Sequence, residues 1–378
     1  MVDTVTQYQH VQQEIDEAIL EVVRSGQYIN GPAVKAFTAQ LQAFMDVPHV
    51  IPCANGTDAL QIALMALGLE PGDEVITPAF TYIATVEVIA LLRLKPVFVD
   101  VDPVTFNLDP QAVLDAMTER TRAIIPVHLF GQAADIECIM PEAKKRGIHL
   151  VEDTAQAIGA SYRFADGSTR RVGTIGDIGT MSFYPSKNLG AFGDGGAIFT
   201  RDAELAQRLL MICNHGSQKR YYHDSIGVNS RLDAIQAAIL GVKLRHLDVY
   251  NQARIAAARC YDRLLSDISG VSLPAWHDDG SHVFHQYTLK LPGGAAQRDA
   301  VKAYLADKGV PSMVYYPVPC HLQPAYRAYG YEPGSMPVSE QLCEQVISLP
   351  MHSELTLDQQ TFIADTFREA VAHTFSTI

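Results

Sequence analysis

A lysine near the middle of the chain follows a strand-like run and is placed for chemistry. Lys187 comes directly after the β-prone residues 181–184 and Pro185, in a loop rich in glycine. A proline-restricted loop at the end of a strand holds the next side chain at the edge of a sheet. Desolvation there lowers the pKa of a lysine, and the neutral amine is the form that attacks an aldehyde. The ordinary alternative is a solvated surface lysine.

An aspartate upstream makes the chemical interpretation more specific. The apolar run 148–152 predicts a buried strand with Asp153 at its carboxyl end, where open α/β sheets bind their ligands. A lysine and an aspartate at two strand ends suit pyridoxal phosphate, because the lysine holds the aldehyde and the aspartate pairs with the protonated ring nitrogen. Opposite charges ~4 Å apart attract by about 4 kcal/mol at an effective dielectric of 20, before desolvation is subtracted.

Other polar and aromatic residues could bind the remainder of such a cofactor. Gly56 and Thr57 open a predicted helix after the first strand, and a helix N-terminus favours a phosphate. The alternative is an ordinary Asn-Gly turn with a capping side chain. Ser182 could bind phosphate or be a satisfied strand serine. Tyr82 could stack on a pyridine ring or belong to the core or its rim.

Composition limits the classes of partner. The chain has 378 residues and a net charge of −13, which argues against nucleic acid or an anionic membrane as the partner. The six cysteines show neither CxxC nor zinc-like spacing, and the histidines show no ligand spacing, so we expect reduced thiols and no metal site. The first residues do not resemble a signal peptide, and no apolar run approaches membrane-spanning length. We therefore expect a cytoplasmic protein.

Strand-like and helical runs alternate through the first two thirds of the chain. This pattern predicts an α/β fold with a three-layer α/β/α large domain and a mostly parallel seven-stranded sheet. The seven expected strands are 49–53, 74–77, 96–100, 123–127, 148–152, 178–184 and 196–200. A long helix is expected from 232 to about 265. Two more strands, 285–291 and 312–316, and two helices then predict a smaller C-terminal α+β domain. We place the large domain at 1–250 and the small one at 251–378.

Taken together, these motifs resemble the DegT-type nucleotide-sugar aminotransferases, a branch of the fold-type I pyridoxal phosphate enzymes. The resemblance extends from about Gly26 to His352. It is carried by residues 54–60, 78–84, 152–156, 182–190, 195–197, 227–233 and 316–321. Each motif is weak alone, but the set is specific.

The resemblance assigns roles in cofactor binding. It implies that Lys187 is the Schiff-base lysine and proton shuttle and that Asp153 is the partner of the ring nitrogen. Gln156 would bind the phenolic oxygen of the cofactor, and Tyr82 would be the stacking aromatic residue. The residues expected to bind the phosphate are Gly56, Thr57 and Ser182.

Further roles concern the second subunit and the substrate. Asn229 matches a family residue that reaches the phosphate from the neighbouring subunit, which implies a homodimer with shared active sites. The loop from His215 to Tyr221, Arg231, Tyr316 and His321 match positions that contact the nucleotide sugar. Tyr315 stands where many relatives have histidine. The resemblance therefore does not decide whether the hexose carries a methyl group or a carboxylate at its far end.

The resemblance implies transamination of a nucleotide-linked keto-sugar, with an amino acid such as glutamate as donor, in the synthesis of polysaccharide or related glycans. Residues 229–233 resemble 3-aminating members more than 4-aminating ones, so we favour a 3-keto sugar linked to UDP or dTDP. The alternatives are a 4-keto sugar aminotransferase, a pyridoxal phosphate enzyme that does not aminate, such as a sugar dehydratase, and a cofactor-binding regulatory protein. The retained lysine argues against a dehydratase, since the family's dehydratases have histidine there.

Overall fold

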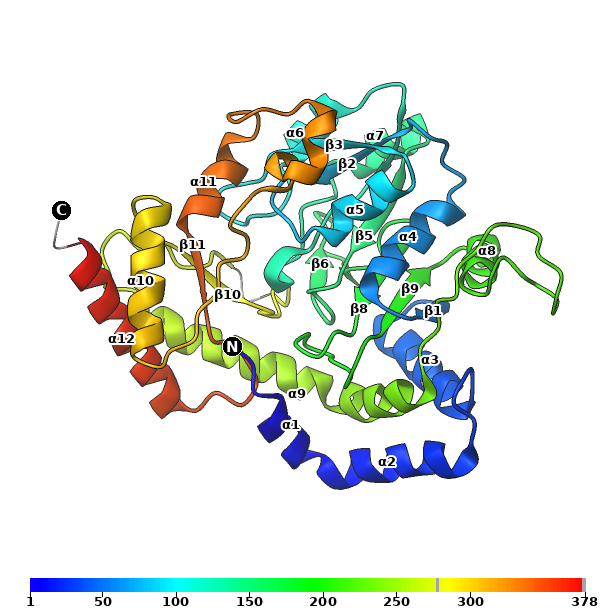
Figure 1. Ribbon diagram of the computed structural model, residues 1–378, viewed down its shortest axis with the longest axis horizontal. Coiled ribbons are helices and arrows are strands. Elements are labelled where there is room, and N and C mark those ends of the chain that lie inside the picture. Colours follow the sequence, from blue (N-terminus) through cyan, green and yellow to red (C-terminus); the bar gives the residue numbers. More distant parts are fainter. Residues whose placement is uncertain (277–278, 376–378) are drawn as a thin grey trace.

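The computed structural model describes residues 1–276 and 279–375, and its larger part is a sheet between two layers of helices (Figure 1). The strand order is β1-β9-β8-β5-β4-β2-β3, and β9 is the one strand that runs against its neighbours in this sheet. The strands are β1 His49–Cys53, β2 Glu74–Pro78, β3 Lys95–Val99, β4 Thr121–Ile124, β5 His149–Asp153, β8 Ile178–Ser182 and β9 Gly196–Thr200. The predicted seven-stranded, mostly parallel sheet is confirmed.

The sheet is covered on both faces because alternate strand residues enter different cores. On β2, Val75 packs in one hydrophobic cluster with α4, α5 and α8, whereas Ile76 packs in another with α6 and α7. Helices α3 and α9 cover the other end of that second face. Strands buried on both faces are apolar almost throughout, which explains why the sequence signal was strong. The helices of this part are α1 Thr4–His10, α2 Gln12–Ser25, α3 Pro32–Met45, α4 Gly56–Ala66, α5 Ala84–Leu91, α6 Pro110–Ala116, α7 Met140–Arg146 and α8 Ala203–Cys213, with η1 at Leu129–Gly131 and the hairpin β6 Ser161–Arg163 and β7 Thr169–Arg171.

Helix α9, Ala234–Leu265, is 32 residues long and runs across the lower part of Figure 1, between the sheet and α2. Its first half packs against α3 and the sheet, and its second half belongs to a separate core with β10 and α12. The predicted boundary at residue 250 falls within this helix. The division into domains 1–250 and 251–378 stays a prediction.

The C-terminal part is a two-stranded sheet flanked by helices. Its elements are β10 Tyr287–Lys290, α10 Ala295–Asp307, η2 Cys320–Leu322, η3 Pro324–Tyr329, α11 Pro337–Gln345, β11 Val346–Leu349 and α12 Leu357–Phe375. The expected strand 312–316 was wrong, because only an isolated bridge between Met313 and Ser348 forms there. Pro311 and Pro317, which lack an N–H, flank this run and leave it little room for a ladder.

Candidate active site

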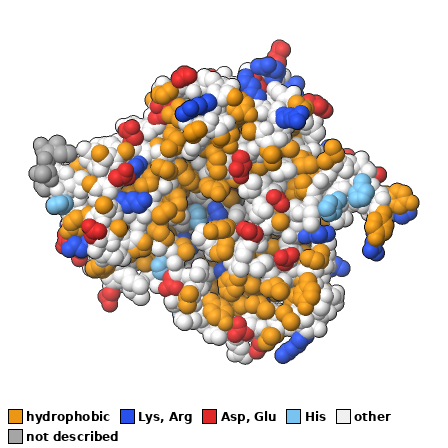
Figure 2. Space-filling view, in the orientation of Figure 1, with side chains coloured by type: hydrophobic (Ala, Val, Ile, Leu, Met, Phe, Trp, Pro, Cys, Tyr) orange, Lys and Arg blue, Asp and Glu red, His pale blue; other side chains and the backbone are white. Residues whose placement is uncertain are grey.

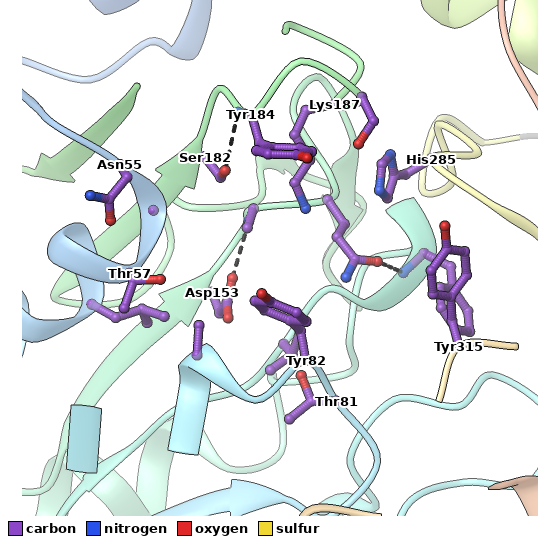
Figure 3. Close-up of a pocket in the computed structure, with 18 of the residues that line it drawn as sticks. Asn55, Thr57, Thr81, Tyr82, Asp153, Ser182, Tyr184, Lys187, His285 and Tyr315 are labelled. Atoms are coloured by element: carbon purple, nitrogen blue, oxygen red, sulfur yellow. Dashed lines mark hydrogen bonds between the residues drawn. The ribbon is translucent and has the colours of Figure 1, made fainter. Parts of the chain in front are cut away.

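A cavity of about 510 Å³ opens where β5 and β8 end, and it collects most of the predicted site residues (Figure 3). A volume of this size suits a cofactor or a drug-sized ligand. Nine predicted residues line it: Gly56, Thr57, Tyr82, Asp153, Gln156, Ser182, Lys187, Tyr315 and Tyr316. Seven of them follow or adjoin strands of the large sheet, which brings them to one edge, and Tyr315 and Tyr316 come from the C-terminal part.

Lys187 lies in the turn after β8 and reaches into this cavity (Figure 3). The turn is fixed by the Lys187 N–H, which donates to the carbonyl of Tyr184 at 2.8 Å. Burial lowers the pKa of Lys187 to about 8, and the charge of Asp153 opposes that shift. The amine is therefore available in its neutral, nucleophilic form near neutral pH.

Asp153 ends β5 and is only 5% exposed. Its Oδ1 accepts the N–H of Ala155 at 3.1 Å, and its Oδ2 accepts the hydroxyl of Thr85 at 2.9 Å. These two bonds from different elements fix the orientation of the carboxylate. The site thus has a buried anion ready to pair with a cationic group of a ligand.

The N-terminus of α4 forms another wall of the cavity. Asn55 caps this helix, since its Oδ1 accepts the N–H of Asp58 at 2.8 Å. A Cβ on Gly56 would lie 2.6 Å from the Cβ of Ser182, so only glycine lets the helix approach the end of β8 this closely. Backbone N–H groups at a helix start and the hydroxyls of Thr57 and Ser182 are a suitable donor set for a phosphate.

Aromatic and amide side chains line the rest of the cavity. Tyr82, 56% exposed, lies with its ring 6.2 Å from that of Tyr316. Gln156 accepts the N–H of Phe130 at 2.8 Å and donates to the hydroxyl of Tyr316 at 3.2 Å. Burial raises the pKa of Tyr316 well above its usual range, so its hydroxyl stays protonated. These groups offer a flat face and neutral hydrogen bonds.

Four predicted residues lie outside the lining of this cavity in the described chain: His215, Asn229, Arg231 and His321. His215 and Asn229 stand at the base of the loop after α8, where Asn229 pairs with Asn214. His321 is 1% exposed, and its Nε2 lies 3.1 Å from Glu340. Their roles in binding substrate or the neighbouring subunit's phosphate stay predictions.

The sequence analysis missed several lining or supporting residues. The hydroxyls of Thr85 and Thr81 lie 3.4 Å apart, but Thr81 precedes α5, which begins at Ala84, so no helical periodicity in the sequence connects the two residues. His285, Tyr184 and Asn55 also line the cavity. Tyr184 and Asn55 lie within motifs that carry the resemblance but were given no role, and His285 lies in no motif. Burial and the charges of Lys187 and Arg254 lower the pKa of His285 well below its usual range, so its ring is neutral.

The residues present fit pyridoxal phosphate. The glycine-dependent close contact at Gly56 leaves helix N–H groups for a phosphate, while Asp153 supplies an anion and Lys187 a neutral amine within the same cavity. Within residues 1–276 and 279–375, no cluster of three or more His, Cys, Asp or Glu side chains could hold a metal ion. In the same residues, no helix has the length and apolar character needed to span a membrane.

A family model described as the DegT/DnrJ/EryC1/StrS aminotransferase family matches residues 9–368. The chain belongs to this family. It is 48% identical to a pleiotropic regulatory protein from Geobacillus stearothermophilus, over 99% of this chain and 98% of that one. It is 46% identical to a UDP-2-acetamido-2-deoxy-3-oxo-D-glucuronate aminotransferase from Pseudomonas aeruginosa, over 94% and 95%.

Solved structures of the family agree with the fold. DesV from S. venezuelae is 42% identical and superposes with a TM-score of 0.92 over 97% of each chain. NtdA from Bacillus subtilis, solved with bound cofactor PMP, is 31% identical, with a TM-score of 0.86 over 95% of this chain and 81% of that one. The predicted fold class, the aminotransferase activity and the pyridoxal phosphate cofactor are confirmed.

Proposed function

We propose that this aminotransferase moves an amino group from an amino acid donor, glutamate, to the keto group of a nucleotide-linked sugar. The observation that carries the proposal is the buried Lys187 in one cavity with Asp153 and the Gly56 helix start, in a chain similar to a nucleotide-sugar aminotransferase. The aminated sugar would enter polysaccharide or related glycan synthesis.

Each residue of the cavity has a task in this reaction. Bound pyridoxal phosphate supplies a ring that takes up electrons when the donor's Cα–H bond breaks. Lys187 holds the cofactor between turnovers and, once displaced by the donor, carries the Cα proton. Asp153, oriented by Thr85 and Ala155, pairs with the ring nitrogen. The start of α4 and Ser182 bind the phosphate.

Other residues of the cavity would contact the cofactor ring and the sugar. Tyr82 and Gln156 line the same cavity, where Tyr82 would stack on the ring and Gln156 would donate to its phenolic oxygen. The sugar would lie beside Tyr315, which stands on the side of the cavity away from Thr57 and Ser182 (Figure 3), with Tyr316 also in the lining. His215, Asn229, Arg231 and His321 lie outside this cavity in one chain.

We place the acceptor keto group at C3 of the sugar. The name of the relative from Pseudomonas aeruginosa specifies a 3-oxo sugar, and residues 229–233 resemble those of 3-aminating members. A 4-keto sugar is the competing substrate.

A second candidate function is regulation without turnover, because the relative from Geobacillus stearothermophilus is named a pleiotropic regulatory protein. The geometry favours catalysis, since attachment of the cofactor needs only the lysine and the phosphate site, whereas a carboxylate oriented by two donors to pair with the ring nitrogen serves the uptake of electrons during turnover.

The test begins with glutamate added to the purified yellow protein. A transaminase loses the absorbance of the lysine-bound cofactor and releases 2-oxoglutarate, whereas a regulator does neither. The aminated enzyme is then given UDP- and dTDP-linked 3-keto and 4-keto sugars, and NMR of the products locates the new amino group. Amination at C3 supports the proposal, and amination only at C4 contradicts it.

A further inference from the structure

Helix α9 carries buried polar side chains beneath the loop that holds Lys187. Lys243, 2% exposed, donates to the carbonyl of Gly190, three residues after the lysine. Asn251 is 4% exposed and lies two turns further along the same helix. A buried amide or ammonium is costly unless it is hydrogen-bonded, so these residues need a reason to be there.

The reason for Asn251 is a bridge between three segments that build the cavity. Its Oδ1 accepts the Nδ2–H of Asn188 at 2.9 Å, and Asn188 is the residue directly after Lys187. Its own Nδ2 donates to the carbonyl of Ile158 at 3.0 Å, in the segment that follows Asp153 and Gln156.

Asn188 extends this bridge to the C-terminal part of the chain. Its Nδ2 also donates to the carbonyl of Val283 at 2.9 Å, two residues before His285 of the cavity wall. Asn188 is 3% exposed. Gly159 allows the close packing, because a Cβ there would lie 2.5 Å from Nδ2 of Asn251.

We propose that Asn251 is a positioning residue for catalysis. It acts through Asn188 to fix the position of Lys187 relative to the segment that follows Asp153 and to the side of the cavity formed by His285. It touches neither cofactor nor substrate. The inference rests on the proposed role of Lys187 and goes beyond it. A side chain outside the cavity thereby fixes how far the amine reaches.

Loss of the bridge should affect the lysine more than the fold. Without Asn251, Asn188 keeps only its bond to Val283, and the loop can shift by a fraction of an ångström. Misplacing a catalytic group by ~1 Å can cost up to about a hundredfold in rate. A looser loop also admits water, which favours the protonated amine. The charge of Asp153 on β5 acts on the pKa of Lys187, and the charge of Lys187 acts on that of His285, whose carbonyl accepts from Arg254 of α9. The other titratable side chains that line the cavity are those of Asp194, Tyr82, Tyr184, Tyr315 and Tyr316.

The experiment compares holoenzyme variants in the half-reaction with glutamate, so no sugar is needed. Asn251→Ala should slow the half-reaction about tenfold while the apparent affinity for glutamate changes less than about twofold. The absorbance of bound cofactor reports the proton on the nitrogen that joins Lys187 to the cofactor, and its pH midpoint should move upward because admitted water stabilises the charged form of that nitrogen. Gln360→Ala is the matched control, because Gln360 is also buried and donates to an α9 carbonyl, that of Ala257, at 2.8 Å.

The route through Asn188 is tested by a double-mutant cycle. Asn188→Ala should slow the half-reaction similarly, and Asn188→Ala/Asn251→Ala should be no slower than Asn188→Ala alone. If Asn251→Ala does not fold, the milder Asn251→Ser should show a smaller change in the same direction. The inference would be overturned if the variants at position 251 had the same rate and pH midpoint as Gln360→Ala. It would also be overturned if the double variant were slowed by the product of the two single effects, because the two residues would then act independently. A wild-type protein that does not react with glutamate would instead contradict the proposed function, and the pH midpoints would still test Asn251.

Discussion

Lys187 and Asp153 face opposite demands within one cavity. In the proposed reaction the amine must be neutral to react, so burial helps it, whereas the carboxylate must stay charged, and the Ala155 N–H and the Thr85 hydroxyl both donate to it. The two groups also influence each other, since the charge of Asp153 raises the pKa of Lys187 against the effect of burial. The pKa of Lys187, which reflects the balance between burial and the charge of Asp153, can be measured.

The pH dependence of cofactor attachment reports the lysine directly. Because the pKa of Lys187 is lowered to about 8, the rate at which cofactor-free protein captures pyridoxal phosphate should rise tenfold per pH unit below about pH 8 and then level off. Asp153→Asn removes the charge that raises this pKa, so its plateau should begin at lower pH. A wild-type rate that keeps rising toward 10.5, the ordinary lysine value, contradicts the assignment.

Thr85 can be tested by removing one hydroxyl. Thr85→Val keeps the shape of the side chain but leaves Asp153 without one of its two donors, a loss of about 2 kcal/mol for a bond to a charged group. The half-reaction with glutamate should slow roughly thirtyfold. Thr77→Val is the control, since the buried hydroxyl of Thr77 has no partner among the described residues. Equal rates for the two variants would mean that Thr85 does not orient the carboxylate.

At the scale of elements, the site depends on where β5, β8 and α4 end or begin. Strand ends after apolar runs are visible in a sequence, and so are an Asn-Gly turn before a helix and a lysine after a proline. These features allowed Lys187, Asp153, Gly56 and Ser182 to be predicted together. The cavity that contains them follows from the parallel sheet, which places the ends of β5 and β8 at one edge.

The close contact between α4 and β8 gives a prediction about an element. Gly56→Ala places a Cβ 2.6 Å from that of Ser182, so the helix start must move away from the strand end. We expect a loss of about 1–3 kcal/mol in the free energy of unfolding and much faster dissociation of the cofactor. Gly294→Ala, at the start of α10, is the control because its Cβ would meet no atom closer than 3.7 Å. Thermal unfolding and the rate of cofactor release are the measurements. A Gly56→Ala variant that retains cofactor as well as the control would contradict the proposal that the start of α4 binds the phosphate.

Other parts of the site could not be predicted because they depend on contacts between distant segments. Thr85 becomes important only once the start of α5 meets the end of β5, and Asn251 only once α9 passes beside the Lys187 loop. His285 enters the cavity from beyond α9, a placement that local periodicity does not encode. The expected strand 312–316 failed for a local reason, since prolines at both ends limit its pairing.

At the scale of the whole molecule, one segment extends away from the body. The loop between α8 and α9 forms an arm at the right of Figure 2, with Tyr221 79%, Tyr222 61% and Ile226 86% exposed. Asn229 closes the base of this arm, outside the cavity of its own chain. This placement is what we expect if Asn229 serves a neighbouring subunit, as proposed from the sequence.

Mixing two inactive variants tests the shared active site. If Asn229 acts across subunits, a dimer of one Lys187→Ala chain and one Asn229→Ala chain contains one intact site and one doubly damaged site. Random mixing should then restore about a quarter of wild-type activity. If Asn229 acts within its own chain, no mixed dimer has an intact site, and activity stays at the level of the separate variants. Size-exclusion chromatography with light scattering checks that the mixed protein is dimeric.

The most direct measurement of the central claim is to locate the cofactor on the chain. Borohydride treatment of the yellow holoenzyme makes the bond between cofactor and lysine permanent, and peptide mass spectrometry then identifies the modified residue. The account predicts a single pyridoxyl group on Lys187, and none on Lys243, the other buried lysine whose pKa is lowered to about 8. A label on any other lysine, or no label on a protein that retains its colour, would contradict it.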